Sequence, residues 1–280
     1  MNETPATSQW AAARGDKWSA HLSGMEATLL PLDEPLIRAL QLDRPVRIAE
    51  VGCGGGGTAM NISRRAPQGS VVHGFDVSPT LIEVARERAL GAGSAAIDFQ
   101  IADMATAMPP RPYDRLASRF GVMFFDEPPR AFANLARWLP PGGHFAFAVW
   151  GPVSENPWMT TVRDAVAGVV EIPQTAPDAP GPFRYGDVDK LLALLGDAGF
   201  ANLAARDWQG ALPIGGGLPP VEAAHFAIAA FSSFGELLQF AGDDASEQAH
   251  QALADAFTQH QQDGTVRMNA LVRFVTGTRR

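Results

Sequence analysis

The chain of 280 residues is poor in several features that mark particular classes of protein. It has one cysteine, Cys53, so it can form neither a disulfide within itself nor a cysteine-rich zinc site. It contains no run of about 18 apolar residues, which predicts no membrane span, and its polar N-terminus shows no signal-peptide pattern. From these absences we expect a cytoplasmic protein.

Positive charge is also scarce. The chain has 22 Lys and Arg against 30 Asp and Glu, a formal net charge of −8. Nucleic-acid binding depends on basic patches that neutralise phosphates, and the arginine pairs at 64–65 and 279–280 are too few to build one. We therefore expect a small-molecule substrate and no nucleic-acid partner.

Residues 46–57 are the most informative segment. The β-branched side chains of Val46, Ile48 and Val51 predict a buried strand, and glycines follow at 52 and at 54–57. Glycines at this point remove side chains where the chain turns, and they allow backbone N–H groups to approach a ligand. With a helix expected over residues 58–65, the segment predicts the first strand–loop–helix unit of a nucleotide-binding type of fold.

Three interpretations of this glycine loop compete. The spacing of Gly52, Gly54 and Gly57 satisfies the pattern of dinucleotide sites. The loop also suits an S-adenosylmethionine site, or a tight turn that binds nothing. Glu50 favours the second interpretation, because an acid two residues before the first glycine can receive the cofactor's ammonium group. A dinucleotide offers no cation there, and an unpaired buried carboxylate is costly.

Two later strands are also predicted to end in carboxylates. Residues 71–76 end at Asp76, which can accept hydrogen bonds from both hydroxyls of a ribose. The alternative role for Asp76 is a helix N-cap, which Ser78 can supply equally well. Residues 96–104 form the other strand, where Asp103 can accept a hydrogen bond from an adenine amino group beside the backbone of Met104.

These motifs, in this order and spacing, resemble the class I S-adenosylmethionine-dependent methyltransferases. The match is closest to the small-molecule group that includes the ubiquinone- and menaquinone-biosynthesis methyltransferases. The segments that carry the resemblance are 50–56, 75–79, 102–104, 113–114, 118–125 and 139–143. The resemblance implies an α/β fold with a Rossmann-like, doubly wound sheet of seven strands. It also implies the strand order 3-2-1-4-5-7-6, with strand 7 antiparallel, and helical lid insertions.

The resemblance further implies S-adenosylmethionine as the cofactor and a set of residues around it. A helix before the first strand closes over the cofactor in such enzymes, so Trp18 is included, although core packing beside Trp10 is an alternative for it. The segment 118–120 contacts the methionine part. The implied cofactor-binding residues are Trp18, Glu50, Gly52, Cys53, Gly54, Asp76, Val77, Asp103, Met104, Ser118, Arg119 and Phe120.

We expect one methyltransferase domain over residues 1–280, with a helical cap at 1–45 and a cofactor-binding core at 46–150. Two insertions, 151–186 and 209–265, are candidate substrate lids. We predict helices at 10–23, 221–240 and 252–260. The phenylalanines of the second insertion suit a hydrophobic or aromatic substrate. Alternatively, they attach the insertion to the sheet.

Histidine and acidic residues add little further chemistry. His225, in the second insertion, is the only histidine that we propose as a general base, and an isolated histidine is more often structural. Asp243, Asp244 and Glu247 are interpreted as a solvated helix start. We therefore expect no metal site.

The sequence leaves three functions open. The first is transfer of a methyl group from S-adenosylmethionine to a small hydrophobic or aromatic molecule. The second is a nicotinamide-dependent oxidoreductase, which Glu50 disfavours, and the Tyr-x-x-x-Lys pair of many such enzymes is absent from the sequence. The third is a non-catalytic protein that binds S-adenosylmethionine.

Overall fold

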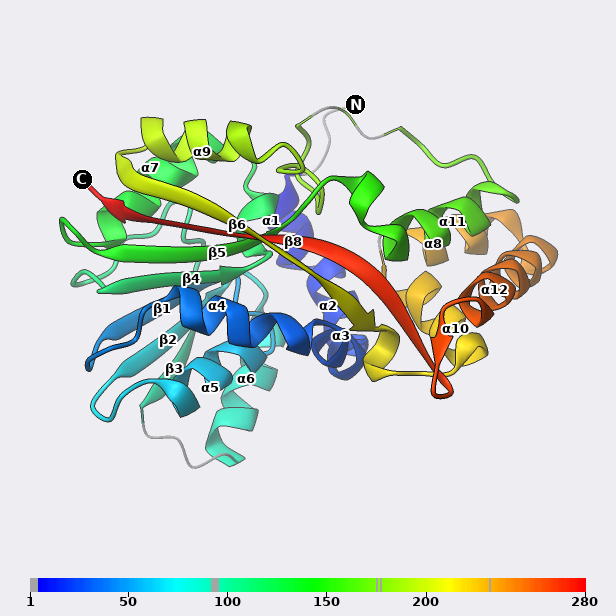
Figure 1. Cartoon of the computed structure of the whole chain (residues 1–280), viewed down its shortest axis with the longest axis horizontal. Helices are drawn as coiled ribbons and strands as arrows, with labels where there is room; N and C mark the ends of the chain where they lie inside the picture. The colour runs from blue at the N-terminus through cyan, green and yellow to red at the C-terminus, as the bar shows by residue number, and fades with distance from the viewer. Residues whose placement is uncertain (1–4, 92–95, 175, 177, 232) are drawn as a thin grey trace.

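The computed structural model describes residues 5–91, 96–174, 176, 178–231 and 233–280. Its centre is one twisted sheet, in which seven strands follow the order β3-β2-β1-β4-β5-β8-β6 and the short β7 pairs with β8 (Figure 1). The strands are β1 Arg47–Val51, β2 Val71–Asp76, β3 Ile97–Ile101, β4 Arg115–Arg119, β5 His144–Trp150, β6 Phe200–Pro213, β7 Gln261–Gln262 and β8 Thr265–Arg279.

The strand order confirms the predicted topology. Strands β1 to β5 run parallel, while β8 is antiparallel to both β5 and β6. The two-residue β7 precedes β8 in the chain, so β8 takes the place of the expected strand 7. All seven residues of β5 are buried, as its continuous apolar run predicts for a strand at the centre of a sheet covered on both faces.

Helices cover both faces of the sheet (Figure 1). Helices α4 Asp33–Ala39, α5 Gly57–Arg65 and α6 Pro79–Gly91 lie on one face, and α7 Pro128–Trp138 and α9 Val188–Asp197 lie on the other. Helix α7 illustrates why: proline occupies its first turn, and Phe132, Leu135 and Trp138 recur at helical spacing and are fully buried.

Two further groups of helices lie beyond the carboxyl ends of the parallel strands. The N-terminal group contains α1 Ala6–Trp10, α2 Ala13–Ala20, α3 Leu22–Leu29 and the 3-10 turn η1 Leu30–Leu32. The outer group contains α8 Pro157–Ala167, the turn η4 Ile214–Gly216, α10 Pro220–Ala230, α11 Phe234–Ala241 and α12 Asp243–Thr258. Figure 1 shows the N-terminal helices between the sheet and the outer group.

Three predicted helices were wrong in their extent. The segment 10–23 is divided among α1, α2 and α3, because the backbone leaves the helical region at Ala12 (φ −134°, ψ −115°) and again at His21 (φ −112°, ψ 15°). The segment 221–240 contains two helices, since Phe231 is extended after α10. Helix α12 starts at Asp243, nine residues before the predicted position 252, directly after Gly242 with its φ of +97°.

The expected subdivision of the chain maps onto these elements. Residues 1–45 contain α1 to α4, of which residues 1–4 lie outside the described part. The core 46–150 contains β1 to β5, with residues 92–95 outside the described part. The insertion 151–186 contains α8, and 209–265 contains the end of β6, α10 to α12 and β7; residues 175, 177 and 232 of these insertions lie outside the described part. The role of both insertions as substrate lids stays a prediction.

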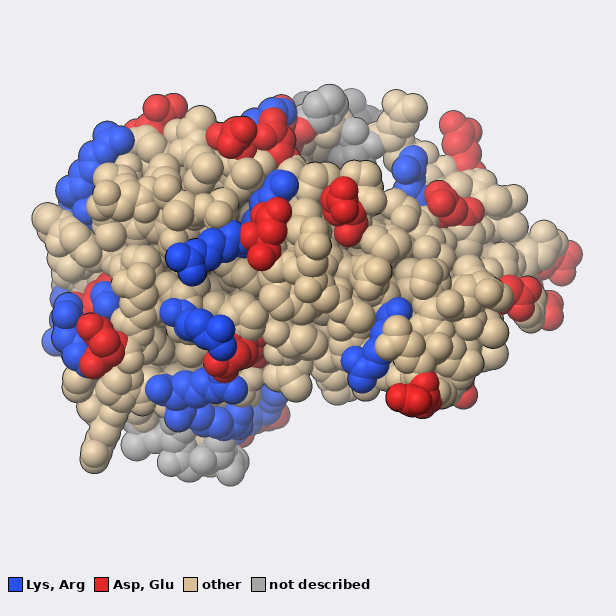
Figure 2. Space-filling model, viewed as in Figure 1, with Lys and Arg blue, Asp and Glu red and all other residues tan. Residues whose placement is uncertain are grey.

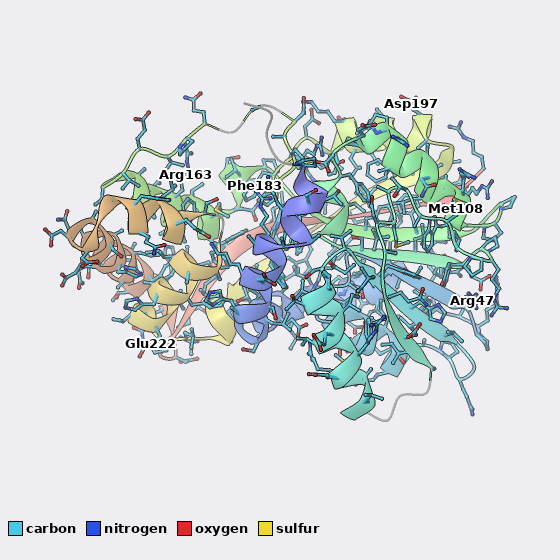
Figure 3. The ribbon with its side chains drawn as sticks, turned by 180° about the vertical axis from the view of Figure 1, so that it is seen from behind. Arg47, Met108, Arg163, Phe183, Asp197 and Glu222 are labelled. Carbon is cyan, nitrogen blue, oxygen red and sulfur yellow. The ribbon has the colours of Figure 1, made fainter. Side chains whose placement is uncertain are left out.

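Aromatic side chains join the outer helices to the sheet. Trp150, at the end of β5, packs against Trp158 of α8 with their ring centroids 4.7 Å apart, and Trp158 packs against Phe231 at 5.1 Å. Phe183 contacts both tryptophans, and Figure 3 shows it where the sheet meets the outer helices. These contacts fix the position of the outer helices relative to the carboxyl ends of the strands.

The surface carries both signs of charge. On the face seen in Figure 2, basic and acidic side chains are interspersed, with a group of basic side chains near the lower edge. Among the described residues, no helix is both long and apolar enough to cross a membrane. The expectation that no nucleic acid is a partner stays a prediction.

Candidate functional site

The glycine loop turns sharply between β1 and α5. The N–H groups of Gly52 and Cys53 both donate to the carbonyl of Phe75 at the end of β2, at 2.8 and 3.0 Å. Gly52 has a φ of +67°, and a Cβ built on it would lie 2.9 Å from the Cα of Gly121. A glycine is required here both for the backbone conformation and for the close approach of the segment after β4. Cys53 is buried within this loop, which suits a small packing residue.

Glu50 is the most unusual group in the loop region. It is 1% exposed, and its Oε2 has no hydrogen-bond partner among the described residues. Burial raises the pKa of Glu50 well above its ordinary value, and the nearby positive charge of Arg119 opposes this shift. A buried carboxylate oxygen without a partner is costly to retain, so the site is suited to a ligand that supplies a positive hydrogen-bond donor.

Asp76 connects the end of β2 to the glycine loop. Its two carboxylate oxygens accept hydrogen bonds from the N–H groups of Gly54 and Ser78, each at 2.9 Å. Burial raises the pKa of Asp76, while these backbone donors oppose the shift. The Ser78 hydroxyl accepts from Leu81 N–H in the first turn of α6, so Ser78 provides the helix cap that the sequence allowed it. Val77, between them, is half-buried.

Asp103 and Met104 follow β3, and their hydrogen bonds are made within the protein. The carboxylate of Asp103 accepts from the N–H of Ala105 at 2.9 Å and from the Thr106 hydroxyl at 3.1 Å, so it stabilises its own turn. Met104 is buried, and its carbonyl accepts from the side-chain amide of Asn134. An adenine contact by Asp103 stays a prediction.

The segment after β4 completes the wall of the site. The hydroxyl of Ser118 donates to the carbonyl of Val51 at 2.8 Å, which ties the end of β4 to the end of β1. Phe120 has a left-handed backbone (φ +68°), and its ring stacks on Trp150 at a centroid distance of 4.3 Å and an interplanar angle of 5°. A bulky residue in this conformation is strained, and it is found most often at functional sites.

Arg119, the last residue of β4, is held by groups from the N-terminal segment. It is almost fully buried, donates to the carbonyl of Leu29 and forms an ion pair with the buried Asp33 at 3.1 Å. Asp33 also accepts from the Thr58 hydroxyl in the first turn of α5. The N-terminal helices and the core therefore share one buried polar network beside Glu50.

The N-terminal helices also contact the glycine loop directly. A Cβ built on Gly54 would lie 3.6 Å from the indole nitrogen of Trp18, so Trp18 lies over the loop as the resemblance implies. A Cβ on Gly55 would collide with Leu22 of α3. The core-packing alternative for Trp18 also holds in part, since its ring contacts Trp10 at 5.9 Å.

Sequence reasoning missed two residues here. Glu26 of α3 accepts from the N–H of Gly57 at 3.2 Å and pairs with Arg88 of α6 through two hydrogen bonds of 2.8 and 2.7 Å. A Cβ on Gly57 would lie 2.7 Å from the Glu26 carboxyl carbon. Two glycines of the loop, 55 and 57, thus make room for α3. No local sequence signal links residues 26, 57 and 88.

These contacts border a cavity of about 600 Å³. Its walls include Glu26, Gly57, Arg64, Arg88 and Arg119. Ala20, Ser23 and Ala27 of the N-terminal helices also line it.

The structure does not bring His225 to this site. His225 is exposed on α10, and its ring packs against His250 of α12 with a centroid distance of 4.3 Å. It lines neither this cavity nor a second cavity between the N-terminal and outer helices. Within the described residues, no group of three or more His, Cys, Asp or Glu side chains is placed to hold a metal ion.

Comparison with known proteins identifies the core. Residues 48–143 match the family described as "Methyltransferase domain". They form a class I, S-adenosylmethionine-dependent methyltransferase domain. Its cofactor is S-adenosylmethionine. The residues around Glu50, Asp76 and the glycine loop of this methyltransferase domain fit that cofactor, because the unpartnered oxygen of Glu50 matches its ammonium group.

Relatives of known activity share the methyltransferase domain over part of their length. The chain is 31% identical to aklanonic acid methyltransferase DauC of Streptomyces sp. strain C5 over 39% of this chain and 52% of that protein. It is 34% identical to trans-aconitate 2-methyltransferase of Streptomyces avermitilis over 48% of this chain and 50% of the relative. The chain thus spans about half the length of the curated relatives it matches.

Solved structures extend the likeness to the whole chain at the level of fold. Haemonchus contortus phosphoethanolamine N-methyltransferase 2, in complex with S-adenosyl-L-methionine, superposes with a TM-score of 0.59 at 13% identity. The superposition covers 100% of this chain and 61% of that one. At this identity the likeness concerns the fold alone.

Proposed function

We propose that the protein transfers a methyl group from S-adenosylmethionine to a small, hydrophobic or aromatic molecule. The observation that carries the proposal is the buried Glu50, whose Oε2 lacks a partner at the tip of β1. Bound S-adenosylmethionine supplies a sulfonium methyl group that a nucleophile can displace. The chain's own residues bind the cofactor, orient it and exclude water around it.

Each residue has a role that its contacts support. Glu50 receives the ammonium group, and Asp76, already aligned by the N–H groups of Gly54 and Ser78, receives the ribose hydroxyls. Ser118 holds the ends of β1 and β4 together. Trp18, over the loop, limits the access of water. Since His225 faces α12, we assign no proton transfer to it.

The names of the relatives support a small acceptor. Aklanonic acid and trans-aconitate are small organic acids by name, and both relatives share the domain with this chain. The aromatic side chains between the sheet and the outer helices favour an apolar acceptor here. The cytoplasmic location stays a prediction from the single cysteine.

Two alternatives remain distinct. A nicotinamide-dependent oxidoreductase does not explain Glu50, because a dinucleotide brings no cation to that oxygen. A non-catalytic protein that binds S-adenosylmethionine explains the cofactor site equally well and differs only in turnover.

The test is a turnover assay with deuterated S-(methyl-d3)-adenosylmethionine and a panel of phenols, aromatic amines and organic acids. Mass spectrometry then detects the d3-methyl product together with S-adenosylhomocysteine. A labelled product from any member of the panel supports the enzyme. Tight cofactor binding with no labelled product over a broad panel favours the non-catalytic alternative.

A further inference from the structure

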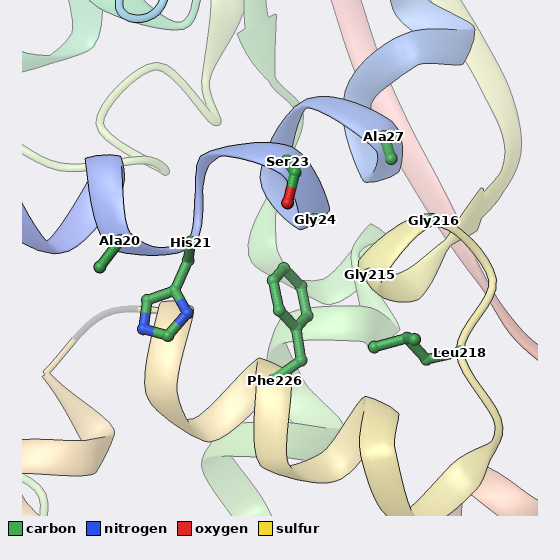
Figure 4. A pocket seen from close by; sticks show the side chains of 9 residues that line it. All are labelled: Ala20, His21, Ser23, Gly24, Ala27, Gly215, Gly216, Leu218 and Phe226. Atoms are coloured by element: carbon green, nitrogen blue, oxygen red, sulfur yellow. The ribbon is translucent and has the colours of Figure 1, made fainter. Parts of the chain in front are cut away.

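A second cavity, of about 450 Å³, opens between the N-terminal helices and the outer helices. Its walls come from the α2–α3 junction on one side and from η4 and α10 on the other. Figure 4 shows the rings of His21 and Phe226, the side chain of Leu218 and the hydroxyl of Ser23 around the same space. The volume lies within the range of small-molecule sites, about 300–1,000 Å³.

The lining combines polar and apolar surface in similar measure. The rings of His21 and Phe226 meet edge to face, with centroids 6.3 Å apart at 81°. Leu218 and Ala20 add apolar surface, while the Ser23 hydroxyl and the His21 imidazole supply hydrogen-bonding groups. None of the residues that line this cavity in the described structure is Asp, Glu, Lys or Arg. Such a lining favours an uncharged ligand with both an apolar and a polar part over a phosphate or a polycarboxylate.

The ring of Phe226, a residue of α10, packs against the backbone of α3. A Cβ built on Gly24 would lie 2.5 Å from Cε2 of Phe226, so the ring rests directly on the helix at Gly24. Both Phe226 and His21 remain only partly buried. Their rings are thus held in position while keeping surface that a planar molecule can cover.

Two sets of contacts connect the walls of this cavity to the cofactor-binding elements. His21 stands between Trp18, which lies over Gly54, and Leu22, which packs on Gly55. The second set is a series of packed aromatic rings, in which the centroids of neighbouring rings are 4.3 to 5.7 Å apart. It runs from Phe120 after β4 through Trp150, Trp158 and Phe231 to Phe226.

We propose that this cavity binds the acceptor, and that the acceptor is an uncharged, planar aromatic molecule bearing a hydroxyl or amino group. Its ring packs on Phe226 and Leu218, and its polar group hydrogen-bonds to the His21 imidazole. The assignment of the ligand as the acceptor rests on the proposed methyl transfer, whereas binding to the cavity can be measured without it. His21, rather than His225, is therefore the histidine beside the proposed acceptor.

The test measures binding of 2-naphthol by its intrinsic fluorescence to the full chain, with and without S-adenosylhomocysteine. Three substitutions probe the cavity: His21→Phe keeps a ring but removes the ring nitrogens, Phe226→Leu removes the ring, and Leu218→Trp fills the space without touching the cavity beside the glycine loop. His260→Asn and Phe240→Leu are matched controls, because Phe240 is exposed on α11 and His260 is exposed in the turn after α12.

We expect His21→Phe and Phe226→Leu each to raise the 2-naphthol Kd by about tenfold, the size of one hydrogen bond or one aromatic contact. Leu218→Trp abolishes binding, and the controls change the Kd less than about twofold. Calorimetry with S-adenosylhomocysteine should give the same Kd for all variants, which shows that they are folded.

Absence of saturable 2-naphthol binding, or equal Kd values in the cavity variants and the controls, overturns the proposal. Failure of the wild-type protein to bind S-adenosylhomocysteine, with 2-naphthol binding intact, contradicts the proposed methyl transfer and leaves the cavity as a binding site. The two failures are thus distinguishable.

Discussion

The carboxylate of Glu26 is held by both terminal nitrogens of Arg88, at 2.7 and 2.8 Å, and accepts the N–H of Gly57 at the same time. Arg88 also donates to the carbonyl of Gly55. One carboxylate from α3 thereby joins the N-terminal helices to the cofactor loop and to α6. The negative charge lies at the N-terminus of α5, where the helix dipole favours it.

Loss of this carboxylate should loosen the glycine loop. We expect Glu26→Gln to weaken S-adenosylhomocysteine binding by roughly five- to tenfold, about 1 kcal/mol, since the pair is partly exposed and screened by solvent. Isothermal titration calorimetry measures the change. Glu127→Gln is the matched control, because Glu127 and Arg130 form an exposed pair at 3.8 Å away from the loop. A lower Tm with unchanged cofactor affinity would limit Glu26 to a structural role.

We expect Glu50 to lower the stability of the free protein and to raise its affinity for the cofactor. Because burial raises its folded-state pKa, the folded state binds the proton more tightly than the unfolded state does. Its contribution to stability is therefore largest at low pH and decreases as pH rises from the ordinary glutamate range through the raised folded pKa. Glu50→Gln removes this loss of stability with rising pH, so we expect the variant to have a higher Tm than the wild type at pH 7 without ligand. A gain of about 1 kcal/mol corresponds to roughly 2–4 °C.

The same substitution should weaken S-adenosylmethionine binding by about tenfold or more, because the ammonium group loses its charged acceptor. Thermal unfolding between pH 5 and 8, with and without cofactor, measures both effects. Parallel pH profiles for the two proteins, or unchanged affinity, would remove Glu50 from the cofactor site.

Asp76 should matter for both the loop and the cofactor. Asp76→Ala removes the acceptor of the Gly54 and Ser78 N–H groups, and we expect cofactor affinity to fall by roughly 1.5–3 kcal/mol. Asp103→Ala is the informative comparison, since Asp103 is engaged with its own turn. Calorimetric Kd values for both variants separate the two carboxylates. Equal affinity of Asp76→Ala and the wild type would contradict the ribose assignment.

Much of the sheet could be predicted because its signals are local. The β-branched run before Gly52 and the carboxylates at the end of β2 and just after β3 each act within a few residues. Helix breaks without such signals were missed. Phe231 leaves the helical conformation where it packs between Trp158 and Phe226, which is a tertiary cause. Gly242, in contrast, was a visible signal for the start of α12.

The candidate site likewise contains residues that local signals predict and residues that only tertiary packing brings together. Glu50, Asp76 and Ser118 follow strands whose ends meet at one edge of a parallel sheet, so their proximity was predictable. Glu26 and Arg88 come together only because α3 docks on the glycine loop, and His21 lines a cavity only because η4 and α10 pack beside α3. Those contacts depend on the packing of helices that are far apart in the sequence.

The most direct test is calorimetric titration of the purified protein with S-adenosylmethionine, S-adenosylhomocysteine, NADH and NADPH. The methyltransferase domain and the unpartnered oxygen of Glu50 predict saturable binding of the first two and none of the nicotinamides. Binding of a nicotinamide cofactor in their place would contradict the account.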